Sequence, residues 1–187
     1  MKGNEDNKSK FFLPHEQIDE WGATELHRST RKGDIDLCEW LISKGADVNA
    51  RDNYGATPLY WAAWNGGYDL AKLLLNQGAN SNIPDYGGET PLYWASTKRH
   101  YEIVRLLCDR GAKAGLSDNK GFSTLTAACK DGNLKMIKLL LDRGADPNGG
   151  VSLHIALELY HNDIVKILVD HKGCDVDKMK KNEQALM

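Results

Sequence analysis

The sequence predicts an all-α fold, a solenoid of about five stacked helix-turn-helix repeats with projecting β-hairpin loops. The first supporting observation is a strict period of 33 residues that glycines, aspartates and leucines all keep. The second is that each period holds two apolar patterns at helical spacing, neither of which could bury its apolar face alone. The units must therefore stack. The periodic residues are Gly22, Gly55, Gly88 and Gly121; Asp19, Asp52, Asp85 and Asp118; and Leu26, Leu59, Leu92 and Leu125.

The unit at residues 52–84 shows the local signals most clearly. Asp52 and Gly55 have turn chemistry, because aspartate bonds its own backbone and glycine tolerates positive φ. Thr57 is expected to cap a helix that begins at Pro58, where no backbone donor is missed. A pair of glycines ends this helix, and leucines at three-and-four spacing predict a second helix after it.

The repeats are expected at about 19–51, 52–84, 85–117, 118–148 and 149–177, after a polar tail and capping segment at 1–18 and before a C-terminal tail or truncated sixth repeat at 178–187. The fifth repeat breaks the period. Asn49 and Leu59 are ten residues apart, whereas Asn148 and Leu153 are five apart. We therefore expect that the fifth repeat lacks the projecting hairpin, and that Ser152 caps its first helix one position late.

Several apolar residues need separate placement. Phe11, Phe12, Leu13 and Ile18 precede the first repeat and do not fit its register. We expect them to cover the exposed end of that repeat; the alternative is a short docking segment for another protein. Trp40 takes the slot that leucine holds in the later repeats, and we expect it to pack in the core.

Composition narrows the class of protein. The chain has 187 residues, of which 41% are hydrophobic and 27% charged, as is ordinary for a soluble protein of one domain. No apolar run is long enough to span a bilayer, and the N-terminus lacks the apolar core of a signal peptide. The net charge of −2 argues neither for nor against nucleic acid.

The cysteines follow the repeat register. Cys38, Cys108 and Cys129 stand where other repeats carry alanine or aliphatic residues. They are therefore interpreted as buried, reduced thiols rather than a disulfide framework. Reduced thiols suit an intracellular compartment, the cytoplasm or the nucleus.

No arrangement of residues points to catalysis. The cysteines have neither the CxxC spacing nor the Cys–His spacing of a zinc site. No nucleophile-elbow pattern surrounds a serine, and the glycine-rich loops lack the lysine and serine of a phosphate-binding loop. We expect no enzyme activity, no cofactor and no metal.

The motif T-P-L stands at residues 57–59 and again at 90–92, each time at the start of a helical pattern. Together with the period, it makes the chain resemble the ankyrin-repeat family over roughly residues 19–177. The resemblance implies a non-catalytic interaction module, an adaptor or scaffold. It also implies that His27 and His154, at the family's T-P-L-H position, bond nearby backbone and hydroxyl groups.

The resemblance further implies that hairpin tips and first helices form a concave groove that contacts the partner. Large aromatics at such positions are better explained by a contact than by a core. Six cations against Glu20, Glu89 and Asp131 make this groove mildly positive, which suits an acidic segment of another protein. The candidate partner-binding residues are Trp21, Arg31, Lys32, Arg51, Tyr54, Trp64, Tyr86, Lys98, Lys120 and Phe122.

Two further functions stay open. The groove could recognise a nucleotide or oligonucleotide, with bases stacked on aromatics and lysines on phosphates. The residues for this role are Trp61, Trp64, Trp94, Lys98, Lys120 and Phe122. Alternatively, the chain is a purely structural segment of a larger protein. We expect a monomer that binds no membrane.

The pairs Tyr60-Trp61 and Tyr93-Trp94 lie 33 residues apart and allow two placements. Either they form a bulky core whose indole nitrogens find local acceptors, or the indoles reach the groove floor and stack on a flat ligand.

Overall fold

The computed structural model describes residues 18–149, 151–172, 174–175 and 177. Within this part of the chain there are ten helices and no strand, which confirms the all-α solenoid. The expected polar tail, Phe11 to Leu13 and the C-terminal tail lie outside the described residues. The helices are α1 (Glu25–Lys32), α2 (Ile35–Ser43), α3 (Pro58–Asn65), α4 (Tyr68–Asn76), α5 (Pro91–Thr97), α6 (Tyr101–Asp109), α7 (Thr124–Lys130), α8 (Leu134–Asp142), α9 (Ser152–Glu158) and α10 (Asn162–Asp170).

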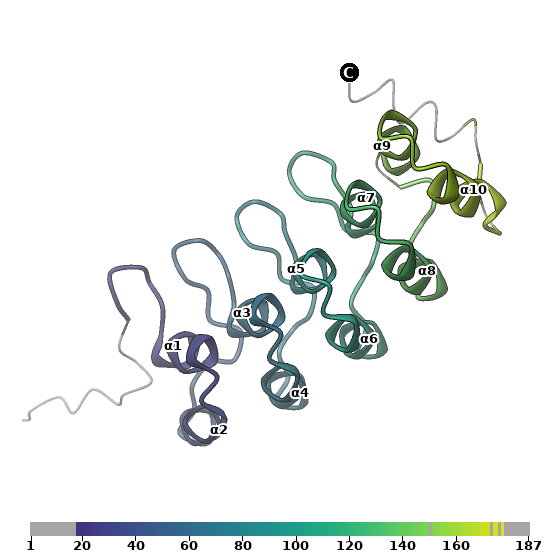
Figure 1. The fold of residues 1–187 in the computed structure, drawn as a ribbon. Helices are drawn as coiled ribbons and strands as arrows, with labels where there is room; N and C mark the ends of the chain where they lie inside the picture. Colours follow the sequence, from purple (N-terminus) through teal and green to yellow (C-terminus); the bar gives the residue numbers. More distant parts are fainter. Residues whose placement is uncertain (1–17, 150, 173, 176, 178–187) are drawn as a thin grey trace, which may run out of the picture.

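The helices form two layers in a curved row (Figure 1). The odd-numbered helices make the inner layer on the concave side of the row, and the even-numbered helices make the outer layer on the convex side. A loop projects on the concave side beyond each of the first four inner helices but not beyond α9. The connection from α8 to α9 spans only residues 143–151. We call residues 19–23, 52–56, 85–89 and 118–122 hairpins 1 to 4.

One aspartate closes each hairpin. In hairpin 2, Asp52 Oδ1 accepts the amides of Tyr54 at 2.9 Å and Ala56 at 3.0 Å. The backbone amide of Asp52 also donates to the Ala56 carbonyl at 3.0 Å. The same pattern recurs at the other three periodic aspartates. The predicted turn chemistry therefore holds in all four hairpins.

Side-chain hydroxyls cap three of the inner helices. Thr57, Thr90 and Ser123 each accept an amide three residues later at 3.2 Å. Ser152 does not cap α9, contrary to expectation, because it is already the first helical residue. Its hydroxyl instead lies 2.9 Å from the Thr126 hydroxyl of the preceding inner helix.

The core repeats layer by layer with the sequence period. Leu26, Leu59, Leu92 and Leu125 of the inner helices are at most 1% exposed, and Leu41, Leu74, Leu107 and Leu140 of the outer helices are completely buried. Full burial of such a side chain is worth about 1.5–3 kcal/mol relative to exposure. Stacking between repeats, rather than any single helix, therefore stabilises the fold.

Two apolar residues are more exposed than expected. Trp40 is 44% exposed, because no helix precedes α2 in the described outer layer to cover it. Ile18 is 67% exposed and bridges Thr24 through its backbone, so its side chain does not cover the first repeat.

The thiols lie among the core side chains. Cys38 and Cys129 are completely buried, while Cys108 is only partly buried. Burial raises the pKa of all three thiols, that of Cys129 to about 12. The interpretation as small buried side chains therefore fits two of them fully and Cys108 in part.

The two T-P-L-H histidines behave differently. The Thr24 amide donates to His27 Nδ1 at 3.1 Å, so His27 Nε2–H donates to the Ala56 carbonyl of hairpin 2, also at 3.1 Å. His154 Nε2 instead lies 3.0 Å from Glu158 Oε1 on its own helix. No hairpin follows α9 in the described part of the chain, so the expectation for His154 is wrong.

Asparagines tie the loops of successive repeats together on the outer side. The amides of Asn49 and Asn82 each bond two backbone groups of the next repeat. Gly115 stands at the next position of this series and has no side chain to make the link. The helices α6 and α8 also touch less extensively than α2 with α4, or α4 with α6.

A left-handed residue follows each inner helix. Gly33, Gly66 and Gly132 fill this position with φ of 81°, 79° and 65°. Arg99 and Tyr160 fill it in the other two repeats, with φ of 62° and 57°. Side chains other than glycine are strained there, so these two repeats carry a local cost.

We expect Arg99→Gly to raise the free energy of unfolding by about 1 kcal/mol, because the strain outweighs the extra chain entropy of glycine. Urea denaturation followed by circular dichroism measures the change. Arg105→Gly is the matched control, since it places the same change inside α6 and should lower stability by about 1 kcal/mol. Equal losses in both variants would show that Arg99 makes contacts worth more than its strain.

Candidate functional site

The four hairpins are joined into one continuous ladder. Each main-chain bond between neighbours is 2.8–2.9 Å long, and asparagine side chains reinforce two of the three steps. The ladder therefore fixes the tips relative to one another. The main-chain bonds run from the amides of Asn53, Tyr86 and Asn119 to the carbonyls of Trp21, Tyr54 and Gly87, in that order.

Three aromatic rings stand exposed on this ladder. Trp21 and Tyr54 are 52% and 56% exposed and stack at 6.4 Å between ring centroids with 15° between the planes. Tyr86 is 65% exposed and packs against the Gly55 backbone of the preceding hairpin. The register thus brings these candidate residues onto one row.

Arg51 supports the row rather than standing free. Its Nε donates to the Gly55 carbonyl at 3.1 Å, and its Nη2 donates to the Pro84 carbonyl at 2.8 Å. The guanidinium lies 5.0 Å from the ring centroid of Tyr86. The structure therefore gives Arg51 a structural contact between hairpins 2 and 3.

The inner helices add a second group of rings beside the hairpins. The centroids of Trp64 and Trp94 lie 3.9 Å apart, and Lys98 Nζ sits 4.3 Å from the Trp64 centroid and 5.8 Å from that of Trp94. Trp64 is partly buried for this reason, whereas its register position had indicated exposure. Lys98 and the two indole rings therefore already interact with one another in the absence of a partner.

The two Tyr-Trp pairs divide between core and surface. Tyr60 is 6% exposed and belongs to the core, whereas Trp61 and Trp94 are partly exposed. The Trp61 indole donates to Asp52 Oδ2 at 3.0 Å, so it finds a local acceptor as one placement had it. The Trp94 indole N–H is buried and makes no hydrogen bond to any described residue.

Hairpin 4 and α7, together with residues of hairpin 3 and α5, line a hollow of about 280 Å³. Phe122 is partly buried in its wall, and Lys120 and Lys130 lie at its rim beside Glu89 and Asp118. Both signs of charge therefore meet around the ring of Phe122.

The charge of the groove is less uniform than the sequence count implied. That count left out Asp52, Asp85 and Asp118, which lie at the base of the hairpins. Burial, followed by the carboxylates of Asp85 and Glu89, raises the pKa of Tyr60. Burial and the same aspartate also raise the pKa of Glu89. The hairpin side of the groove is therefore acidic, and the cations gather at the C-terminal ends of the inner helices.

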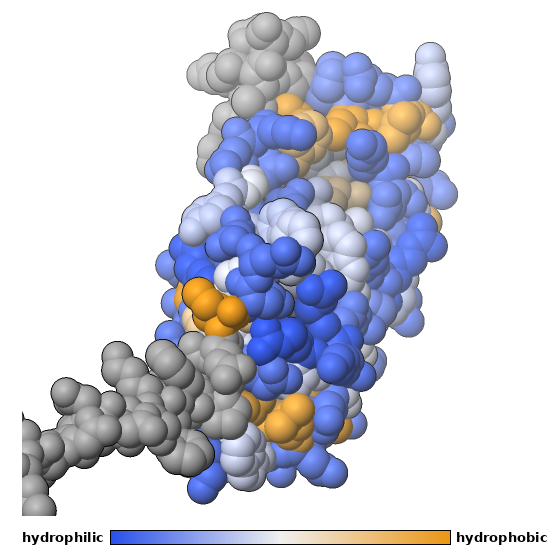
Figure 2. All heavy atoms as spheres, turned by 90° about the vertical axis from the view of Figure 1, so that its left-hand side faces the viewer, coloured by the Kyte–Doolittle hydropathy of each residue, from blue (hydrophilic) through white to orange (hydrophobic). Residues whose placement is uncertain are grey.

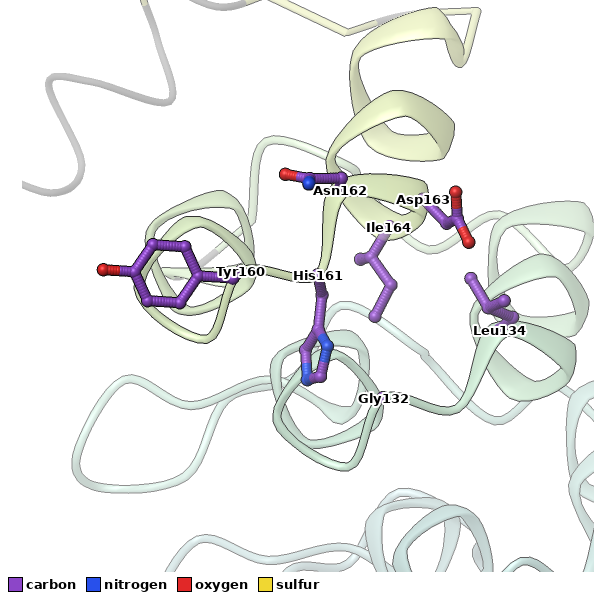
Figure 3. Close-up of a pocket in the computed structure, with 7 residues that line it drawn as sticks. All are labelled: Gly132, Leu134, Tyr160, His161, Asn162, Asp163 and Ile164. Atoms are coloured by element: carbon purple, nitrogen blue, oxygen red, sulfur yellow. The ribbon is translucent and has the colours of Figure 1, made fainter.

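A further hollow, of about 360 Å³, lies between α8 and α10 (Figure 3). The ring of His161 points toward Gly132, while Tyr160 points away from the hollow. A side chain at Gly132 would meet that ring at 3.3 Å, and one at Gly66 would meet His100 at 2.6 Å. Both histidines therefore pack over the glycine of the preceding repeat, which accounts for this hollow without a ligand.

Figure 2 shows the side of the molecule that lies on the left in Figure 1. Most of this face is hydrophilic, and the hydrophobic colour is confined to separate patches. Such a surface offers discrete anchors in polar surroundings, as interfaces between proteins that also exist alone do.

Sequence reasoning missed Asp52 as part of the site. Its carboxylate closes a turn with one oxygen and holds an indole with the other. The recurrent Asp–Trp spacing of nine residues, in Asp52/Trp61 and Asp85/Trp94, was the available signal. Only the first pair forms the bond, so spacing alone could not have decided the matter.

A curved, two-layered row of helix pairs with a rigid hairpin edge defines a repeat solenoid. Its concave side carries the exposed aromatic rings and the cations of the candidate site. The chain belongs to the ankyrin-repeat family, because the family model for ankyrin repeats (3 copies) matches residues 1–85, 26–118, 82–150 and 110–182. A comparison with curated proteins finds no match. Ankyrin repeats generally act as protein–protein interaction modules and are typically non-catalytic.

Two features of the described residues bear on other functions. No group of three or more His, Cys, Asp or Glu side chains there is placed to hold a metal ion. No helix in the same part of the chain is long and apolar enough to cross a membrane.

Proposed function

We propose that this chain is a non-catalytic adaptor or scaffold that holds another protein in the groove between the hairpins and the inner helices α1, α3, α5 and α7. The observation that carries the proposal is the row of aromatic rings on the joined hairpins. Trp21, Tyr54 and Tyr86 are each at least half exposed. Exposed rings of this kind are typical hot spots of interfaces.

Preorganisation supports the same function. The hairpin ladder and the Arg51 contact hold the rings in place before any partner arrives. Binding then costs little ordering of the groove, which leaves more of the contact energy as affinity. Family membership adds the general role of protein binding.

The cations favour a partner with an acidic segment. Arg31, Lys32, Lys98, Lys120 and Lys130 are exposed along the ends of the inner helices and in hairpin 4. Buried thiols support a reducing, intracellular compartment, the cytoplasm or the nucleus. We expect the chain to act there as a monomer.

Recognition of a nucleotide is the less favoured function. Stacking on a base needs a free ring face. The faces of Trp64 and Trp94 are partly taken by each other and by Lys98.

Affinity capture from a cell extract with the full chain tests the function. We compare the wild type with a triple variant, Tyr54→Ala, Trp64→Ala and Tyr86→Ala, and identify captured proteins by quantitative mass spectrometry. Specific partners should be lost, and titration with a purified partner should show at least about 2 kcal/mol lost for a central ring.

The matched control is Trp40→Ala with Tyr68→Ala, which removes two exposed rings from the outer layer. It should retain the partners. Retention of every partner by the triple variant would end the groove proposal. Quenching of tryptophan fluorescence by short oligoadenylates, weakened by added salt, would favour the nucleotide function instead.

A further inference from the structure

Two adjoining hollows lie at the end of the groove formed by hairpins 1 and 2. The larger, about 430 Å³, is lined by Trp21, Ala23, Arg31, Asp52, Tyr54 and Trp61. The other, about 360 Å³, is lined by Asp19, Arg28, Arg31 and Lys32. One hollow is largely aromatic, the other is largely charged, and Arg31 belongs to both.

The charged hollow has cations in excess. Arg28 pairs with Asp19 at 3.3 Å and with Glu25 on its own helix, so its charge is compensated. Arg31 and Lys32 are exposed and form no ion pair within the described part of the chain. Arg31 and Lys32 therefore remain available to a ligand, and the three cations against Asp19 and Glu25 leave one net positive charge.

Arg31 is oriented before any ligand arrives. Its guanidinium lies 4.6 Å from the ring centroid of Trp61, where the aromatic face attracts it. The backbone of Arg31 is tied to the next repeat, since its carbonyl accepts the Asn65 side-chain amide at 3.2 Å. A planar guanidinium fixed in this way can bind a carboxylate through two parallel hydrogen bonds.

The aromatic hollow is equally rigid. The Trp21 carbonyl accepts the Asn53 amide at 2.8 Å, which holds the stacked Trp21 and Tyr54 rings in place. Asp52 holds the Trp61 indole at the base. A hollow of this volume and lining suits a large apolar side chain.

We propose that these hollows take an acidic peptide segment in which a carboxylate stands next to a large apolar side chain. The carboxylate binds Arg31, with Lys32 adding attraction, and the apolar side chain fills the space between Trp21, Tyr54 and Trp61. This inference rests on the proposed protein-binding function and names the chemistry of the segment bound. The faces of Trp21 and Tyr54 are partly taken by each other and that of Trp61 by Arg31, so a peptide side chain fits better than a stacked base.

The test is selection of a random dodecapeptide display library on the immobilised full chain. Wild type should enrich peptides that carry Asp or Glu beside Phe, Tyr, Trp or Leu. Fluorescence anisotropy of a labelled enriched peptide should then show affinity at least tenfold weaker for Arg31→Gln and for Tyr54→Ala. The same peptide with its acids changed to Asn and Gln should lose affinity to a similar extent.

Arg105→Gln is the matched control, because it removes the same charge from the outer helix α6 and should bind as the wild type does. Circular dichroism checks that all variants remain folded. Enriched peptides without acidic residues, or equal affinity for Arg31→Gln and wild type, would overturn the proposal. Binding of oligoadenylate as tight as that of the peptide would also overturn it and assign the hollows to nucleic acid. If the chain bound the peptide only after Phe11→Ser and Phe12→Ser, the hollows would be assigned to the chain itself. Partners captured through Tyr86 and Trp64 would still support the groove function in each of these cases.

Discussion

Gly88→Ala is expected to lower the free energy of unfolding by about 3–4 kcal/mol. Gly88 has φ of +87°, a conformation that costs an alanine energy in itself. The added Cβ would also lie 2.7 Å from the Asn119 amide nitrogen and 2.8 Å from Asp118 Cα. These are backbone atoms of hairpin 4, so the two hairpins would have to separate and lose the bond between Asn119 and Gly87.

Gly111→Ala provides the matched control. Gly111 has the same φ of +87°, but nothing lies within 4 Å of the position that a Cβ would take. Its substitution should therefore cost only the backbone strain, about 1–2 kcal/mol. Urea denaturation of both variants separates strain from contact. If the two losses were equal, the hairpins would be free to shift, and the rigid ladder we describe would be wrong.

Asp52→Ala should lower the free energy of unfolding by about 3 kcal/mol, since three N–H groups lose their acceptor. Two belong to the backbone of hairpin 2, at Tyr54 and Ala56, and the third is the Trp61 indole. Asp52 itself is only 5% exposed, so water cannot readily replace the carboxylate. Denaturation monitored by tryptophan fluorescence measures the loss and reports on the Trp61 environment.

Asp52→Asn divides this loss into its parts. An asparagine oxygen can still accept both backbone amides, whereas its NH₂ group faces the indole donor, so only about 1 kcal/mol should be lost. Trp61→Phe removes the donor, and combining it with Asp52→Asn should add little further loss. If Asp52→Asn proved as damaging as Asp52→Ala, the indole would be the main partner of this carboxylate and the turn a minor one.

Features that depend on a single repeat could be predicted from the sequence. The turn at Asp52, the cap at Thr57 and the helix that begins at Pro58 all follow from local chemistry, and the period then places equivalent residues side by side. The row formed by Trp21, Tyr54 and Tyr86 is a consequence of that register. Its role in binding stays a prediction.

Features that depend on a neighbouring repeat could not be predicted in the same way. Trp40 occupies a core position, yet no preceding outer helix covers it in the described chain. His154 lacks a following hairpin and turns to Glu158. Lys98 and Arg51 looked like free cations, but each lies over a ring that another repeat supplies. Such pairings are decided by side-chain reach, which spacing does not record.

The missing asparagine at Gly115 has a consequence for cooperativity. A linear array behaves as a chain of units coupled only to their neighbours, so its weakest junction decides where order is lost first. The hairpin ladder and the inner layer are continuous across the junction between α6 and α8. On the outer side, side chains replace the asparagine link: Arg143 Nη1 donates to Asp109 Oδ1 at 2.6 Å, and the Tyr101 hydroxyl donates to Asn133 Oδ1 at 3.1 Å. An exposed ion pair contributes at most about 1 kcal/mol, so the hairpin ladder and the inner layer supply most of the coupling across this junction. The same ladder that positions the binding row therefore also carries order from the first three helix pairs to the last two.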